Sequence, residues 1–324
     1  MAKITMIEAV NQALSQEMAR DMDVVLIGED VGIGGVFRAT EGLQAKFGPT
    51  RVFDSPLAES GIIGTAIGMA AYGLKPIAEI QFNSFTMMGY HQLKNHAGKL
   101  RSRSRGRFTV PLVIRTPYGG GIRPLEEHSD SLDTIYSHTP GIKAVVPSTP
   151  YDAKGLLISA IRDPDPVVFL EPTKLYRTIK EEVPDELYTV PIGKGIVRQE
   201  GKDVTLISWG GMMKQTLEAA ELVKEKGISP EVIDLRSICP IDTDIIFSSV
   251  KKTGRVVIVH EDFRSCGLAA EIIAELNENM LTDLIAPPVR IVGFDCPFPL
   301  YKLEDYIMPS TDRVVSGINK AMSF

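Results

Sequence analysis

Residues 143–172 read KAVVPSTPYDAKGLLISAIRDPDPVVFLEP, which predicts a strand, a helix and a second strand in succession. The runs KAVVPS and PVVFLEP are short and apolar, as buried strands are. The helical spacing of residues 151–163 is preceded by Ser148, Thr149 and Pro150, which are start signals for a helix. Strands that alternate with helices of about 10–15 residues favour a mostly parallel sheet with helices on both faces.

The same alternation extends along the chain in both directions. Before this unit we expect a helix at 6–20, a strand at 24–28, a helix at 60–73, a strand at 76–82, a polar helix near 87–103 and a strand at 111–116. After it we expect strands at 203–209, 231–235, 255–261 and 289–294, and helices ending at Lys226, near 242–251, near 267–278 and at 312–322. Residues 172–190 are charged, contain proline and lack periodicity. We therefore predict an α/β fold of two parallel-sheet domains, residues 1–175 and 190–324, joined by a linker over 176–189.

Composition excludes several classes of protein. Of the 324 residues, 44% are hydrophobic and 23% are charged, which is typical of a globular protein. The net charge of −6 argues against nucleic acid as the main partner. No apolar run approaches the roughly 18–20 residues of a membrane span, and MAKITMIEAV has no signal-peptide core. The three cysteines, Cys239, Cys266 and Cys296, have no metal-ligand spacing, so free thiols and a cytoplasmic location are expected.

Acidic residues at two predicted junctions are the first candidates for chemistry. Glu29 and Asp30 directly follow the strand at 24–28, where ligands of open parallel sheets collect, although a solvated turn would look the same. Glu59 opens the helix at 60–73 and could simply favour the helix dipole. The residues behind Glu59 are nearly all small and apolar, however, so its carboxyl would lie at the edge of a dry interface, where it can keep or share a proton.

Glycines in that helix form a stripe of their own. Gly61, Gly64 and Gly68 lie at i, i+3 and i+7, on one face. Each internal glycine costs about 0.5–1 kcal/mol relative to alanine, so another backbone is expected to approach this face. That backbone could belong to this chain or to a second subunit.

Two further segments carry candidate side chains. EIQFNSF (79–85) places Gln81, Phe82 and Phe85 at a strand end, where the aromatic rings are either core or a platform for a cofactor. YGGGIRPLEEHSDS (118–131) predicts a flexible glycine loop followed by His128 among acidic residues; a surface histidine without a task is the alternative. No dinucleotide fingerprint, P-loop or GxSxG elbow occurs.

Taken together, these segments resemble the β subunit of the thiamine-diphosphate-dependent decarboxylase of 2-oxo acid dehydrogenase complexes. The resemblance covers essentially the whole chain. It rests on GEDVG (28–32), GGVFRATEGLQAKFGPTRVFDSPLAESGI (34–62), AEIQF (78–82), EHSDS (127–131), VVPSTPYDAKGLL (145–157), FLEPTKLYR (169–177) and EVIDLRS (231–237).

The resemblance implies a pyrimidine-binding domain and a C-terminal domain similar to those of transketolase. It also implies an α subunit that binds the diphosphate and Mg²⁺ within an α2β2 tetramer, with thiamine diphosphate shared at the interface. The product would be transferred to the lipoyl group of an acyltransferase component, and GGVFRATEGL and GFDCPFP favour a branched-chain substrate over pyruvate or acetoin. A non-catalytic subunit that only completes the assembly is the alternative from another functional class.

Site residues carry over by position. Glu59 matches the glutamate that hydrogen-bonds the aminopyrimidine ring, and Glu29 matches a second acidic position in a proton relay. His128 matches a histidine at the reacting end of the cofactor. The remaining pocket positions are Leu57, through its backbone, Gln81 and Phe85. A structural K⁺ would be held by the backbone carbonyls of Leu112, Ala160, Asp163 and Asp165.

The chain departs from the family at two places. Residues 101–107 read RSRSRGR, so Ser102 replaces a tyrosine and Arg105 replaces a glycine, which affects packing near the expected α-subunit contact. Leu284 and Ile285 stand where some members have acidic residues that bind basic partner domains. The docking surface for the acyltransferase therefore stays open.

Overall fold

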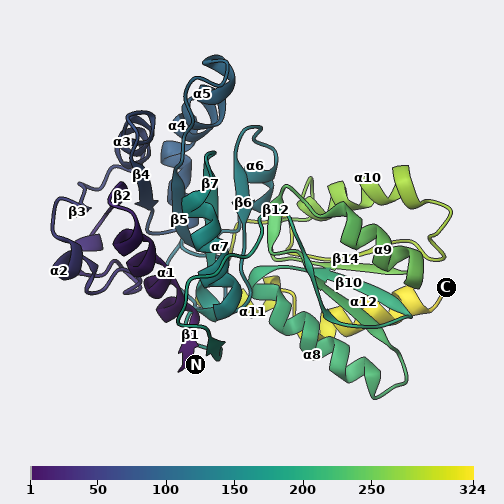
Figure 1. Cartoon of the computed structure of the whole chain (residues 1–324). Coiled ribbons are helices and arrows are strands. Elements are labelled where there is room, and N and C mark those ends of the chain that lie inside the picture. The colour runs from purple at the N-terminus through teal and green to yellow at the C-terminus, as the bar shows by residue number, and fades with distance from the viewer. Residues whose placement is uncertain (1) are drawn as a thin grey trace.

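The computed structural model describes residues 2–324 and contains two large sheets side by side, with the C-terminus on the far side of the second sheet, and a small two-stranded sheet (Figure 1). The first sheet has the order β12-β6-β7-β5-β4-β2-β3. Its strands are β2 (Val24–Gly28), β3 (Val52–Asp54), β4 (Lys75–Glu79), β5 (Val113–Tyr118), β6 (Lys143–Val145), β7 (Val167–Pro172) and β12 (Ser237–Cys239). All of its pairs are parallel except β12 with β6.

The second sheet has the order β14-β13-β10-β11-β9. Its strands are β9 (Ile196–Gln199), β10 (Val204–Ser208), β11 (Pro230–Asp234), β13 (Val256–Val259) and β14 (Val289–Ile291). Only β9 runs antiparallel to its neighbour. The expected α/β fold of two mostly parallel sheets is therefore confirmed.

Helices cover both faces of each sheet. On the first sheet, Leu26 faces the layer of α1 (Met6–Arg20) and α7 (Pro150–Arg162), whereas Ile27 faces α3 (Glu59–Ala71). This division follows from the alternation of side chains along a strand. On the second sheet, α8 (Met213–Lys224) and α12 (Thr311–Met322) cover one face, while α9 (Thr243–Thr253) and α10 (Leu268–Met280) cover the other. Shorter helices are α2 (Leu43–Phe47), α4 (Tyr90–Gln92), α5 (Gly98–Arg103), α6 (Asp133–Ser137) and α11 (Glu304–Ile307).

The structure differs from expectation only in detail where apolar periodicity is weak. The expected helix near 87–103 is present from residue 90 to 103, where α4, η3 (Leu93–Ala97) and α5 follow one another without a break and η3 is a π-helical segment; the 3-10 segment η2 (Asn83–Gly89) precedes it. The expected linker contains the strand β8 (Lys180–Val183), which pairs antiparallel with β1 (Ala2–Thr5). The two-stranded ribbon buries little of KEEV, so this segment needs no alternation of apolar residues. Without that alternation the sequence did not predict the strand.

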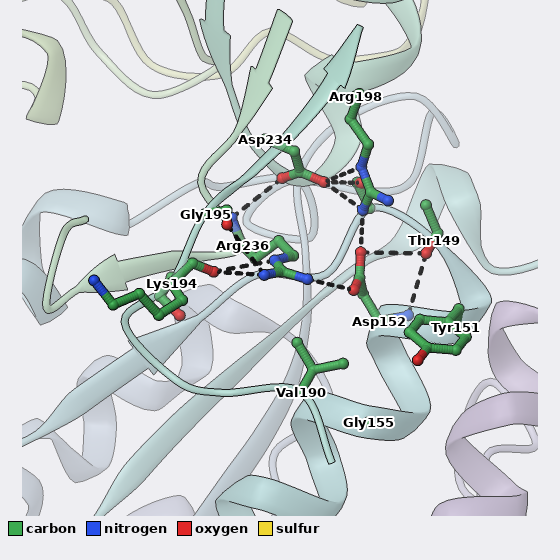
Figure 2. A network of polar contacts seen from close by, with 12 residues as sticks. Thr149, Tyr151, Asp152, Gly155, Val190, Lys194, Gly195, Arg198, Asp234 and Arg236 are labelled. Atoms are coloured by element: carbon green, nitrogen blue, oxygen red, sulfur yellow. Dashed lines mark hydrogen bonds and ion pairs between the residues drawn. The ribbon is translucent and has the colours of Figure 1, made fainter. Parts of the chain in front are cut away.

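A buried ionic network joins the two sheets (Figure 2). Asp152, in the first turn of α7, accepts hydrogen bonds from Arg198 of β9 and, over 3.1 Å, from Arg236 after β11. Asp234, the last residue of β11, accepts from Arg198 over 2.9 Å and from the Ser148 hydroxyl. The network fixes the N-terminus of α7 against the strand ends of the second sheet.

Candidate active site

Four of the expected site residues gather at the carboxyl edge of the first sheet. Glu29 follows β2 and Gln81 follows β4, while His128 lies in the loop after β5 and Glu59 is the first residue of α3, which follows β3. Because β5, β4, β2 and β3 are parallel neighbours, their carboxyl ends meet at one edge.

Two buried carboxyl groups lie near enough to each other there for their charges to interact. Glu29 is 6% exposed and Glu59 is 8% exposed. Burial raises the pKa of the Glu29 carboxyl, and the nearby charges of Glu59 and then Asp30 raise it further. Among the described residues, Glu29 Oε1 has no hydrogen-bond partner although it is buried. The pair can therefore hold and exchange a proton at a carboxyl that has an unused acceptor.

Close packing fixes Glu59 at the start of α3. Ala58 provides no side-chain cap for this helix, and Glu59 is the acidic residue of its first turn. Gly89 of η2 lies against it: a Cβ on Gly89 would be 2.5 Å from Ile63 Cδ1 and 3.0 Å from the Glu59 carbonyl oxygen. Only glycine lets η2 come this close to the helix.

An aromatic cluster surrounds His128. Its ring centroid lies 4.2 Å from that of Phe82 and 5.2 Å from that of Phe85. His128 Nδ1 is 2.6 Å from the Glu126 carbonyl oxygen. Because a carbonyl can only accept, Nδ1 carries a proton in this contact, and in the neutral form of the ring Nε2 is then the acceptor. A histidine in this state can take a proton from a reacting group.

The other expected positions differ in their surroundings. Gln81, which directly precedes Phe82 in the sequence, is partly buried. Leu57, two residues before the start of α3, is 77% exposed. The residues expected to hold K⁺ lie at the opposite edge of the sheet, because Leu112 precedes β5 and Asp163 and Asp165 precede β7. The structure thus brings Glu29 close to Glu59 and Phe85 close to His128, and it separates the cation positions from both pairs.

Sequence reasoning missed a buried network beneath this site. Arg115 of β5 donates to Glu79 of β4 and to Glu171 of β7, each over 2.6 Å, and Tyr176 donates to Glu171. A Cβ on Gly35 would collide with the Glu79 carboxylate, so the network supports the loop that follows Glu29. The signal was available: each of the three strands has one charged residue inside an apolar run.

The three glycines before His128 have a role other than the expected flexibility. A Cβ on Gly119 would lie 2.7 Å from Glu261 Oε1, one on Gly120 would lie 2.7 Å from Phe298 Cζ, and one on Gly121 would lie 2.7 Å from Lys174 Cδ. The glycines allow a close approach of the loop to residues after β13 and β14. The sequence could not show this because the partners are more than 130 residues away for Glu261 and Phe298.

The family departures have structural counterparts. Arg105 has a φ of 54°, so it adopts the left-handed backbone conformation that favours glycine, and Gly106 follows at 77°. Ser102 lines an open hollow with Arg101 and Arg105. Leu284 packs on the core of the second sheet, whereas Ile285 is 57% exposed.

Metal-ligand clusters, membrane-spanning helices and disulfide bonds are all absent from the described residues. Within residues 2–324, no group of three or more His, Cys, Asp or Glu side chains is placed to hold a metal ion. No helix of the described chain combines the length and apolar character that crossing a membrane requires. All three cysteines are free thiols.

Comparison with known proteins identifies the family. The family models for the transketolase pyrimidine binding domain and the transketolase C-terminal domain match residues 2–178 and 193–314. The chain is 54% identical over 321 residues to the pyruvate dehydrogenase E1 component subunit beta of Acholeplasma laidlawii, which covers 99% of this chain and 98% of that one. It is 48% identical over 325 residues to the subunit of the same name from Bacillus subtilis, with 100% of both chains covered. This chain belongs to the E1 β subunits of the 2-oxo acid dehydrogenases.

Further comparisons correct one expectation for this E1 β subunit. A third relative, from Staphylococcus aureus, is 47% identical over 325 residues and is also named pyruvate dehydrogenase E1 component subunit beta. The expected preference for branched-chain substrates is therefore not supported, because the short segments behind it are outweighed by identity along the whole chain. A solved split-gene transketolase, described as an inactive beta4 tetramer, matches the E1 β fold with a TM-score of 0.81 over 99% of both chains at 24% identity.

Proposed function

We propose that this E1 β subunit acts with an α subunit in the oxidative decarboxylation of pyruvate and passes the acyl group to the lipoyl group of an acyltransferase. The observation that carries the proposal is the buried pair of Glu29 and Glu59 at the carboxyl edge of the first sheet. Whole-length identity with subunits named for pyruvate dehydrogenase supports the choice of substrate.

Thiamine diphosphate is the cofactor that we propose for this edge. When bound, it supplies the nucleophile and the electron sink for the loss of CO₂. The residues of this chain fit its pyrimidine half, because they offer an unpartnered carboxyl oxygen on Glu29 and an aromatic surface on Phe82 and Phe85. The diphosphate and Mg²⁺ would be held by the α subunit, since the described residues offer no group of carboxylate or histidine side chains for a metal.

Each side chain then has a distinct task. Glu59 would hold a proton toward a pyrimidine nitrogen, and Glu29, whose pKa is raised by burial, would share that proton. Gln81 and the backbone of Leu57 hold the pyrimidine, while Phe85 supports the ring. His128 uses its unprotonated Nε2 to take up and return a proton during acyl transfer.

A second chain is proposed to cover the glycine stripe of α3. A Cβ on Gly61 or Gly64 would make only ordinary contacts at 3.6 and 3.7 Å, and one on Gly68 would meet nothing within 4 Å among the described residues. The close backbone approach that would explain the stripe is therefore not made within residues 2–324. An α2β2 assembly would supply it.

A K⁺ site remains a proposal at the opposite edge of the sheet. The carbonyls of Leu112 and Ala160 each accept one backbone hydrogen bond, which leaves each oxygen a second lone pair for a cation. The carboxylates of Asp163 and Asp165 are already paired with Lys143 and Arg101. Backbone carbonyls are thus the atoms of these residues that fit a monovalent cation.

One assay tests the proposed activity. The tagged chain is recovered with the partner that co-purifies, and CO₂ release is followed from pyruvate and from 3-methyl-2-oxobutanoate, with and without thiamine diphosphate and Mg²⁺. We expect cofactor-dependent release that is faster from pyruvate. Faster release from the branched substrate would overturn the choice of substrate, and no release despite a co-purified partner would favour a non-catalytic assembly subunit. The cytoplasmic location remains a prediction.

A further inference from the structure

The loop that carries His128 is hydrogen-bonded to residues from the C-terminal half of the chain, which contains the second sheet. This loop, residues 119–132, connects β5 to α6. At its start, the Gly120 amide donates to Glu261 Oε2 over 2.8 Å. At its end, Trp209 Nε1 donates to Asp133 Oδ2 over 2.7 Å, and Asp262 accepts from the Thr134 amide and hydroxyl over 3.3 and 3.0 Å.

Glu304 makes the most extensive contact with the loop backbone. Its Oε1 accepts the Gly121 amide, and its Oε2 accepts the Arg123 amide over 3.1 Å. The side chain is 2% exposed. Both oxygens of one buried carboxylate are therefore committed to two amides of the loop, which lie only five to seven residues before His128.

The backbone at this point needs such support. Gly119, Gly121, Arg123 and Glu127 all have positive φ angles, and two of the four are not glycine. Conformations of this kind persist where surrounding contacts stabilise them. The side-chain contacts of His128 stay within the first half of the chain: its Nδ1 contacts the Glu126 carbonyl and its ring contacts Phe82 and Phe85. The loop is thus what carries the influence of Glu304 to the histidine.

We propose that Glu304 is a positioning residue for His128: by binding the amides of Gly121 and Arg123, it holds the loop so that the imidazole stays against Phe82 and Phe85. The inference rests on the proposed role of His128 in acyl transfer. Glu304 lies in the C-terminal half of the chain, which does not contain Glu29 and Glu59. Under this proposal it is nevertheless necessary for acyl transfer.

The test uses the assembled complex with its α subunit and the variant Glu304→Gln. Glutamine keeps one acceptor oxygen but places an amide group against the second backbone N–H, so one hydrogen bond is lost. We expect the amides of Gly121 and Arg123 to exchange with solvent about tenfold faster, measured by mass spectrometry on peptides from 119–132. Asp305→Asn is the matched control, because Asp305 is exposed and, among the described residues, its side chain pairs only with that of Arg123. In this variant the exchange of the Gly121 and Arg123 amides should stay within about twofold of the parent.

Kinetics distinguish positioning from a general loss of structure. CO₂ release with ferricyanide as acceptor and acyl transfer to a lipoyl domain are measured for E304Q, His128→Gln and the double variant. We expect E304Q to slow transfer about tenfold more than release, and to have no further effect when His128 is already glutamine. If E304Q does not assemble, Glu304→Asp makes the same test.

The outcomes separate this inference from the function on which it rests. An equal loss from E304Q in both backgrounds, or unchanged exchange at Gly121 and Arg123, would overturn the positioning role. An impaired H128Q together with a fully active E304Q would overturn the positioning role alone. A fully active H128Q would overturn the proposed role of His128 and the positioning role with it.

Discussion

Arg236 donates a hydrogen bond from Nη1 to Asp152 Oδ1 over 3.1 Å, and both side chains are buried where the two sheets meet (Figure 2). The same carboxylate pairs with Arg198. Asp152 therefore pairs with two guanidinium groups from the other half of the chain, and Asp234 shares one of them, that of Arg198.

Replacing Asp152 with alanine should destabilise the protein strongly. Both arginines would lose a carboxylate in a buried setting, which typically costs about 3–5 kcal/mol in free energy of unfolding. The measurement is the urea midpoint of the purified protein. Glu221→Ala is the control, because it breaks the exposed Lys224–Glu221 pair, for which we expect about 0–1 kcal/mol. Equal midpoints for the two variants would contradict this account of the network.

Glu59→Gln should leave the assembly intact and remove turnover. An amide of the same shape can fill the start of α3, but it cannot donate a carboxyl proton. We expect CO₂ release to fall by about 10²–10⁴-fold, with unchanged mass by light scattering. Glu278→Gln, at an exposed position of α10, is the matched control. Full activity of the Glu59 variant would refute its assignment as the proton donor.

The stability of the protein should depend on pH through Glu261. Burial raises the pKa of this carboxyl to about 7 from its usual 4.5; the Gly120 amide and Lys174 oppose the shift, and Asp262 and Glu304 add to it. The folded state therefore binds more protons than the unfolded state between these values, so the free energy of unfolding falls as pH rises from about 4.5 to 7.

Glu261→Gln removes this titration and keeps an acceptor for the Gly120 amide. Above pH 7 the variant should gain up to about 3 kcal/mol relative to the parent, and below pH 4.5 the gain should vanish. Urea midpoints measured at a series of pH values for both proteins make the comparison. If the urea midpoints of the two proteins differ by the same amount at every pH between about 4.5 and 7, the raised pKa of Glu261 is contradicted.

Gly64→Leu should prevent assembly with the α subunit. The glycine is half-buried on α3, with Gln92 as the contact that a Cβ would meet, and a leucine there would keep a second backbone from approaching the stripe. Light scattering of the co-expressed complex gives its mass. Ala274→Leu, at an exposed small residue of α10, should leave the mass unchanged. An intact complex with the Gly64 variant would argue against an intersubunit contact at this face.

Local pattern was enough to predict the elements that bury an apolar face. The helix α1 begins and ends where the spacing of residues 6–20 placed it, and the strand β2 coincides with VVLIG. Both have strong internal signals: a capping box between Thr5 and Glu8 in one, and five buried residues in the other. The edge strands β8 and β9 were missed because they are only half buried and show no alternation.

The site was predictable to the extent that it follows strand ends. Glu29, Gln81 and His128 each follow a strand, and parallel strands bring such positions to one edge. What could not be predicted depends on contacts between distant segments. No motif in the sequence distinguishes Glu304 from the glutamates that lie on the surface. It becomes an acceptor for the Gly121 amide only when the two halves pack together.

The antiparallel strand β12 has a consequence for how this polypeptide can be divided. It comes from residues 237–239, yet it pairs with β6 at the border of the first sheet. A fragment that stops at the segment between the two family models would leave the β6 border without its partner, exposing a row of unpaired amides and carbonyls to other chains. Exchanging the second half between related subunits would likewise transplant part of the first sheet. Recombination at this segment therefore does not exchange units that fold independently, because the first sheet is completed by a strand from the second half.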